Sequence, residues 1–150
     1  MYADQYPRLV AELTLITGSR EVAEECANEA FTRLIPRWEE VSHYTKPGAW
    51  VRRVGCNLAI DELRRRRRFR RWTPQDDEAI EFEEPELHRV WLSLAHLPPE
   101  QRDLIIRRAV HGQGDREMAH DLGIPIGTVK SRLSRARTAL RQTLEGATHE

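Results

Sequence analysis

The amino-acid sequence predicts an all-α fold, with two small helical domains joined by an acidic flexible linker. Apolar residues recur every three or four positions through most of the 150 residues, and no segment alternates apolar with polar side chains as a half-buried strand does. Residues 73–85 contain no basic residue and few apolar ones, which is typical of a solvated linker. We therefore expect domains at 1–72 and 86–145, followed by a tail at 146–150.

The first domain should open with two helices. Leu9, Leu13 and Ile16 share one face of the first helix, and Gly18 supplies the left-handed residue that commonly follows a helix end. Ser19 is the expected N-cap of the second helix, because its hydroxyl can accept a hydrogen bond from a free backbone amide. The apolar stripe of the second helix is wide and contains Ala23, Ala27, Ala30, Phe31 and Leu34, with Trp38 close by.

A loop is expected over residues 39–47, after Pro36 distorts or ends the second helix. The residue before Pro47 is pushed out of helical geometry, whereas Pro47 itself suits a first helical position. A third helix then runs from Pro47 into the arginine run at 64–68. Two stripes follow this helix, an apolar one with Trp50, Val54 and Leu58 and an outward polar one with Arg53, Asn57, Asp61, Arg64 and Arg68.

The second domain should begin with two helices bounded by proline and glycine. The sequence places the end of the first at Pro98 and Pro99, and the end of the second near Gly112. Their apolar positions are Leu87, Val90, Leu94 and Leu97 in the first helix, and Leu104, Ile105 and Ala109 in the second.

The last two helices have the pattern of a helix-turn-helix. Ala119 is small enough to let two helices cross closely, Gly123 permits the sharp turn between them, and Val129 packs the second helix onto the first. Pro125 fits just ahead of that second helix. The residues expected to fill the interior are Met118, Leu122, Val129, Leu133, Ala136, Leu140 and Leu144.

The outward face of the final helix is suited to DNA. Residues 124–144 contain five basic side chains and no acidic one. A major groove would therefore meet a positive, hydrogen-bonding surface at the start of this helix. The residues that we expect to contact DNA are Thr128, Lys130, Ser131, Arg132 and Arg135.

Charge is segregated along a chain whose formal net charge is zero. Residues 51–72 carry nine basic and two acidic side chains, whereas residues 73–87 carry no basic and seven acidic ones. The chain can thus present two basic surfaces separated by an acidic strip, and such surfaces favour a polyanionic partner.

The remaining composition indicates neither catalysis nor a membrane. Cys26 and Cys56 are far apart, and the six histidines lack the spacing of a metal site, so we expect no disulfide, metal, cofactor or catalytic residue. No apolar run approaches the roughly 18 residues of a membrane span, and the first residues lack the order of a signal peptide. A cytoplasmic protein without membrane insertion is expected.

Four segments together resemble a known family. GTVKSRLSRAR at 127–137, preceded by LPPEQRDLIIRRAVHG at 97–112, resembles domain 4 of the extracytoplasmic-function sigma factors, a subfamily of the sigma-70 family. AEECANEAFTRL at 23–34 is similar to the polymerase-binding helix of domain 2 in that family. AWVRRVGCNLAIDELRRRRR at 49–68 is similar to its promoter-melting helix.

The resemblance implies a promoter-recognition subunit of bacterial RNA polymerase. Domain 2 at 1–72 would bind core polymerase and open the minus-ten element, and domain 4 at 86–145 would read the minus-thirty-five element of promoter DNA as duplex. An anti-sigma protein is the regulator that the resemblance implies. The polymerase contacts carried over by motif are Glu25, Asn28, Glu29, Phe31 and Leu34.

Promoter melting needs a pocket for an extruded base and cations for the separated backbone, because each unstacked base costs a few kcal/mol. The loop before the third helix and the polar stripe on that helix can offer both. The residues expected at the minus-ten element are His43, Tyr44, Lys46, Arg53, Asn57, Asp61, Arg64 and Arg65. Trp50 is expected in the core rather than as a stacking platform.

Alternatives to this interpretation remain at the level of sequence. A stand-alone helix-turn-helix regulator would use the same final helices, although such proteins usually dimerise and no dimer helix is evident. A metal-dependent nuclease would need Glu24, Glu25 and Glu29 to act with a base or a metal ligand, and no motif supplies one. The linker carboxylates Asp76, Asp77, Glu78, Glu83 and Glu84 are either plainly solvated or a shield for the arginine run.

Overall fold

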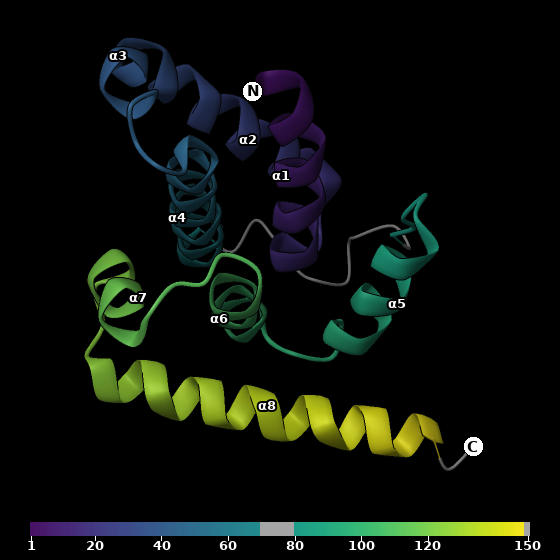
Figure 1. Ribbon diagram of the computed structural model, residues 1–150. Helices are drawn as coiled ribbons and strands as arrows, with labels where there is room; N and C mark the ends of the chain where they lie inside the picture. Colours follow the sequence, from purple (N-terminus) through teal and green to yellow (C-terminus); the bar gives the residue numbers. More distant parts are fainter. Residues whose placement is uncertain (70–79, 149–150) are drawn as a thin grey trace. The chain divides into compact units, whose positions relative to one another are not determined.

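The computed structural model describes residues 1–69 and 80–148, and within them it contains helices and connecting loops but no strand (Figure 1). The chain folds as two compact units, Met1–Ile80 and Glu81–Glu150. The first unit contains α1 (Tyr2–Thr17), α2 (Arg20–Leu34), the 3-10 helix η1 (Ile35–Arg37), α3 (Trp38–Val41) and α4 (Pro47–Arg68). The second contains α5 (Pro85–Leu94), α6 (Pro99–Ala109), α7 (Asp115–Leu122) and α8 (Ile126–Thr148). None of the described helices is long and apolar enough to cross a membrane.

The junction between α1 and α2 has the predicted geometry. Gly18 follows α1 with φ 75° and donates its backbone amide to Thr14, and this left-handed conformation favours glycine. Ser19 caps α2 by accepting a hydrogen bond from the amide of Val22 at 3.3 Å. The two helices then pack against each other, and side chains such as Leu13 and Ala27 are fully buried.

The predicted loop at 39–47 is wrong over its first three residues. Pro36 does distort the end of α2, since residues 35–37 form a 3-10 turn. The chain then resumes a helical conformation as α3, whose last residue Val41 is completely buried. Burial of Val41 explains the extra turn, because an apolar anchor holds the segment against the core. The loop proper is residues 42–46.

The helix α4 buries a different face from the one expected. Its core residues are Val51, Cys56, Ala59, Ile60 and Leu63, whereas Trp50, Val54 and Leu58 are only half-buried. Gly55 explains the rotation. A Cβ atom at this position would lie 3.1 Å from Leu9 of α1, so the two helices cross closely at the glycine.

The second unit begins earlier than the predicted linker end at residue 85. Phe82 is only 8% exposed, and its ring centroid lies 6.5 Å from that of Trp91 on α5. The guanidinium of Arg102 lies over the Trp91 ring, 5.2 Å from its centroid. The linker residues Asp76, Asp77 and Glu78, and the expected boundary at 72–73, lie outside the described residues.

The helix-turn-helix forms as predicted in its central part. Gly123 follows α7 in the left-handed conformation with φ 64°, and Met118, Leu122 and Val129 are buried between the helices. Figure 1 shows α6 and α7 packed over the first half of α8. The inward stripe of α8 is shorter than expected, because burial is complete only through Ala136 and Leu144 is 53% exposed.

Candidate nucleic-acid interface

The five predicted DNA contacts at the start of α8 fall on two sides of the helix. At about 100° per residue, Thr128, Ser131, Arg132 and Arg135 centre on one direction, and Lys130 points roughly 120–150° away from it. Lys130 and Arg135 are exposed, and the other three are half-buried. The Ser131 hydroxyl donates to the backbone oxygen of Thr128 at 3.2 Å. The structure thus presents a polar surface around the outside of the helix rather than a single row.

A buried polar network holds α6 against α7 and the turn before it. Arg107 is completely buried, and its Nε donates to both carboxylate oxygens of Asp103 at 2.9 Å. Its Nη1 lies 3.5 Å from Asp121 on α7. Gln113 joins the network by donating to Asp121 at 3.2 Å. Because α7 and α6 both pack on α8, this network fixes the helix that would enter DNA.

Sequence reasoning did not find this network. Asp103 and Arg107 stand four residues apart and look like an ordinary surface ion pair. Their burial is complete, and burial raises the pKa of the Asp103 carboxyl to about 6 although Arg107 acts in the opposite direction. Leu104 and Ile106 stand between Asp103 and Arg107 in the sequence, and both are buried. These two apolar residues were the sequence signal that this face of α6 points inward.

The polar stripe of α4 forms, and a carboxylate organises its end. Arg53, Asn57 and Arg64 are half-buried, and Asp61 and Arg65 are exposed. Glu62 was not predicted as a functional residue.

Glu62 binds two consecutive arginines of the run. It accepts hydrogen bonds from Arg65 Nε at 3.0 Å and from Arg66 Nε at 2.9 Å. Hydrogen bonds from Arg65 hold the pKa of the Glu62 carboxyl below its usual range. Arg66 also lies 3.8 Å from Glu25 of α2. The ion pair between Arg66 and Glu25 therefore links the arginine run to the helix that was predicted to bind polymerase.

The loop at 42–46 exposes His43, Tyr44 and Lys46 as predicted. Glu40 of α3 stabilises this loop. Its carboxylate accepts a hydrogen bond from the Tyr44 hydroxyl at 2.6 Å and one from Arg37 at 3.2 Å. The hydrogen bond from Tyr44 lowers the pKa of Glu40 and raises that of Tyr44. The loop is thus a defined turn whose aromatic side chain has a fixed hydroxyl.

Arg37 also connects this turn to α4. Its guanidinium carbon lies 5.9 Å from the ring centroid of Trp50, within the range of a cation–π contact. Trp50 is half-buried, so it joins the predicted core only in part and also supports the loop.

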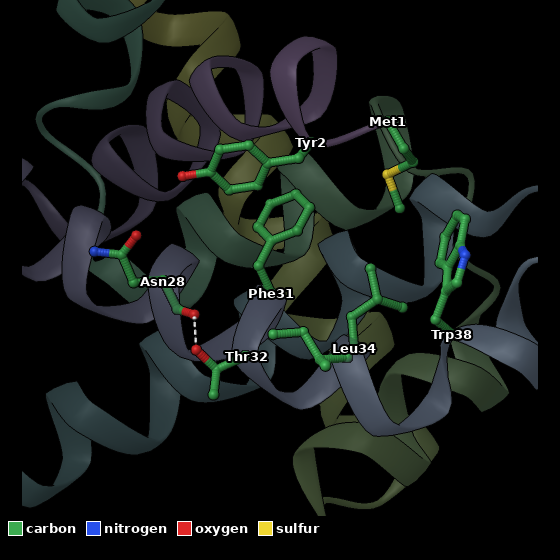
Figure 2. A pocket seen from close by; sticks show the side chains of 8 residues that line it. Met1, Tyr2, Asn28, Phe31, Thr32, Leu34 and Trp38 are labelled. Atoms are coloured by element: carbon green, nitrogen blue, oxygen red, sulfur yellow. Dashed lines mark hydrogen bonds between the residues drawn. The ribbon is translucent and has the colours of Figure 1, made fainter.

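The exposed face of α2 contains a groove that sequence reasoning missed. Glu25, Asn28 and Glu29 are exposed as expected for contacts, whereas Phe31 and Leu34 are 8% and 6% exposed. These two apolar residues form the floor of a cavity of about 640 Å³. Figure 2 shows the lining residues Met1, Tyr2, Asn28, Phe31, Thr32, Leu34 and Trp38 around this cavity, which Ile35 also lines.

The rim of this groove is unusually apolar for an exposed surface. Ile35 is 75% exposed, Tyr2 55% and Trp38 43%, and contiguous exposed apolar groups of this kind mark binding surfaces. Tyr2 packs edge-on against Phe31, with ring centroids 4.9 Å apart. The exposure of Ile35 and Trp38 results from the 3-10 turn at Pro36, which no spacing rule in the sequence would have given.

No group of three or more histidine, cysteine, aspartate or glutamate side chains in residues 1–69 and 80–148 is placed to hold a metal ion. Cys26 and Cys56 are both buried, and the two thiols are not joined in a disulfide. Burial raises the pKa of the Cys26 thiol to about 12.

Comparison with known protein families finds matches in both units. Residues 1–69 match Sigma-70 region 2, and residues 87–140 match Sigma-70, region 4. The first match covers α1 to α4, including the loop and the arginine run. The second covers α5 to α7 and most of α8.

Individual relatives match across both units. The chain is 31% identical to the ECF RNA polymerase sigma factor SigE of Mycolicibacterium smegmatis, over 95% of this chain and 58% of that protein. It is 36% identical to the ECF RNA polymerase sigma factor SigL of Mycobacterium tuberculosis, over 87% of this chain and 78% of that protein. Thus the chain spans little more than half the length of the first of these relatives.

A solved structure has a similar fold. It is the sigma factor RpoE of Bartonella quintana in complex with the anti-sigma factor NepR, with a TM-score of 0.66 and 23% identity. The match covers 96% of this chain and 94% of that one. The all-α fold of this chain is therefore similar to the fold of a solved structure.

Proposed function

Because this chain belongs to the extracytoplasmic-function sigma factors of the sigma-70 family, we propose that it binds core RNA polymerase and directs it to specific promoters. It acts as a regulatory subunit in the cytoplasm rather than as an enzyme. The observation that carries this proposal is the presence of region 2 and region 4 on one chain, each on its own compact unit. A stand-alone helix-turn-helix regulator would have no need of region 2.

Region 4 would recognise the minus-thirty-five element as duplex DNA. The proposal is supported by the helix-turn-helix geometry at Gly123 and by the uninterrupted positive charge of residues 124–144. A recognition helix reads base edges with its first turns, and arginine prefers guanine in such contacts. We assign this role to Thr128, Lys130, Ser131, Arg132 and Arg135, within a functional domain of residues 86–145.

Region 2 would open the minus-ten element, within a functional domain of residues 1–72. The fixed turn that exposes His43, Tyr44 and Lys46 adjoins the start of α4. An aromatic ring stacks on any unpaired base, and arginines neutralise the separated backbone. We assign the backbone and base contacts on α4 to Arg53, Asn57, Asp61, Arg64 and Arg65.

Core polymerase would dock on the outer face of α2. Glu25, Asn28 and Glu29 provide a polar, acidic edge, and the groove floored by Phe31 and Leu34 provides an apolar centre. An apolar centre with a polar rim is the usual anatomy of a protein interface. An amphipathic helix with basic flanks would complement it.

An anti-sigma protein is the proposed regulator. The similar RpoE structure was determined with the anti-sigma factor NepR, and this chain presents an apolar groove that a binding partner would cover.

Run-off transcription with purified core polymerase and a pool of genomic promoter fragments tests the proposal. The expected result is transcripts from a subset of fragments that share two sequence elements at a fixed spacing. Transcription that is independent of the chain, or absent, would contradict the proposal. A matched reaction with the Ile35→Asp variant separates polymerase docking from folding, because Ile35 is exposed and its replacement leaves the core intact.

A further inference from the structure

The buried polar network of the second unit contains more negative charge than positive charge. Its ionisable members are Asp103 and Arg107 on α6 and Asp121 on α7, and none of their side chains is more than 4% exposed. Two carboxylates thus share one guanidinium. With both carboxylates ionised, the three groups carry one net negative charge, and an unbalanced buried charge is costly because little solvent reaches it.

The two carboxylates of this network are held in different ways. Both oxygens of Asp103 accept from the Nε of Arg107 at 2.9 Å, one turn further along the same helix. Asp121 is bound from two other segments, since its Oδ2 accepts from Gln113 at 3.2 Å and from Arg107 Nη1 at 3.5 Å. These contacts of Asp121 join α6, the turn and α7, whereas the contact between Asp103 and Arg107 stays within α6.

The surroundings of Asp103 favour its protonated form. Burial is the largest influence and raises the pKa of its carboxyl to about 6. Glu100 also raises this pKa, whereas Arg107 and His111 lower it. The buried residues of α8, on which α6 and α7 pack, are uncharged, namely Val129, Leu133 and Ala136. Asp103 is therefore placed to take up a proton at mildly acidic pH.

We infer that the network is a proton-binding site, in which Asp103 takes up a proton as the pH falls from neutral to mildly acidic and the second unit becomes more stable. Proton uptake removes the net buried charge. The guanidinium of Arg107 is then balanced by Asp121 of α7 rather than by a carboxylate of its own helix, so the ionic link between α6 and α7 becomes stronger. The inference concerns the fold of the free chain and does not depend on the proposed function.

The direction of the pH dependence follows from the folded and unfolded states of Asp103. In the unfolded chain an aspartate has a pKa of about 3.9, and in the folded chain the pKa of Asp103 is about 6. The folded state binds the proton more tightly. The stability that this group contributes is therefore fully present below about pH 3.9 and is lost as the pH rises through about 6. A carboxylate whose pKa is lowered by folding has the opposite effect.

The test measures urea unfolding of the full-length chain at pH 7.5 and at pH 5.0. Amide NMR signals of Gly112 and Gly123 report on the second unit, because these glycines follow α6 and α7. Asp103→Asn removes the titrating group. Asp115→Asn is the matched control, since its carboxylate pairs with Arg108 at a part-exposed site.

The unfolding equilibrium constant of the second unit should depend on pH through Asp103. Relative to Asp103→Asn, the constant of the wild-type chain should fall about tenfold between pH 7.5 and pH 5.0. The comparison with Asp103→Asn removes the contribution of the other titratable groups. Asp115→Asn should keep the tenfold fall.

Two further variants test the charge balance of the network. Carboxyl carbon-13 NMR of the folded chain gives the midpoint of the Asp103 titration directly, and in the wild-type chain it needs no substitution. Asp121→Asn leaves one carboxylate for one guanidinium, so the midpoint should fall by about one pH unit or more. His111→Gln should raise the midpoint, because His111 lowers the pKa of Asp103.

Three results would overturn the inference. One is a wild-type midpoint for Asp103 at or below that of an exposed aspartate, and this measurement decides even if Asp103→Asn does not fold. Another is the same pH dependence of unfolding in Asp103→Asn and Asp115→Asn. The third is a midpoint that Asp121→Asn leaves unchanged, which would mean that the two carboxylates do not share Arg107.

Discussion

The two units treat their charged side chains in opposite ways. In the first unit the ion pairs of Arg33, Arg37 and Arg65 lie on the surface, with both partners largely exposed except Glu62. Glu12 is buried, but its partner Arg8 is exposed. In the second unit the pair Asp103–Arg107 is completely buried, whereas the cations of α8 form none of the ion pairs found among the described residues.

This difference indicates two modes of DNA binding. The second unit uses its buried ion pair to hold the scaffold, so under the proposed function its DNA face would be formed before DNA binds. The first unit holds Arg65 and Arg66 with the carboxylate of Glu62, so under the proposed function a DNA phosphate would have to replace that carboxylate. The Arg65 side chain is 50% exposed and that of Glu62 22%, so solvent screens this pair only in part.

The largest effect is expected from Asp103→Ala. The substitution removes the carboxylate that both Nε hydrogen bonds of the buried Arg107 reach, and breaking a buried pair typically costs about 3–5 kcal/mol. Urea unfolding should show this loss in the second unit. Asp115→Ala is the matched control, since its carboxylate pairs with Arg108 at a part-exposed site. Equal effects of the two substitutions would show that burial does not distinguish the pairs.

Arg132→Ala should have the next largest effect. Loss of a bidentate base contact costs about 1–3 kcal/mol of discrimination, and the preference at one promoter position should relax. Competition binding between a duplex selected by run-off transcription with the wild-type chain and its single-base variants measures this. If discrimination is unchanged while overall affinity falls, Arg132 contacts the backbone instead.

Glu62→Gln should strengthen binding to single-stranded minus-ten DNA by about two- to fivefold, because it removes the carboxylate that competes for Arg65 and Arg66. Arg65→Gln should weaken the same binding. Fluorescence anisotropy with a labelled oligonucleotide provides the measurement, and Glu29→Gln is the control because Glu29 pairs with Arg33. Weaker binding by Glu62→Gln would mean that the carboxylate positions the arginines for DNA.

The smallest effect is expected at the cysteines. Burial raises the pKa of Cys26 to about 12, so its thiolate is scarce in the folded protein up to pH 9. The two buried thiols should react with Ellman's reagent only after denaturant is added. Rapid reaction of the native protein would show that the core around Cys26 opens readily.

Sequence reasoning succeeded where local chemistry decides the structure. Gly18, Ser19 and Gly123 specify helix ends through their own backbone and hydroxyl properties, and all three were correctly placed. It failed where packing between distant segments decides. The close approach of Leu9 at Gly55 rotated α4, and the network around Arg107 needs partners from α6, α7 and the turn between them.

The candidate site follows the same division. The exposed cations of α8 were predicted because helical spacing alone places them outside. The groove that Arg108 of α6 lines together with Lys130 and Arg137 of α8 was not predicted, because it requires the end of α6 to meet α8. The apolar groove on α2 was not predicted either, because it depends on the turn at Pro36. Phe31 and Leu34 form the floor of this groove.

A footprint of the reconstituted polymerase complex on a selected promoter tests the central claim most directly. Hydroxyl-radical cleavage and permanganate reactivity are measured on the same fragment. The account predicts protection at two separated elements, with permanganate-reactive thymines only at the downstream one, where region 2 would hold unpaired bases. A single palindromic footprint that forms without polymerase and contains no reactive thymine would contradict it.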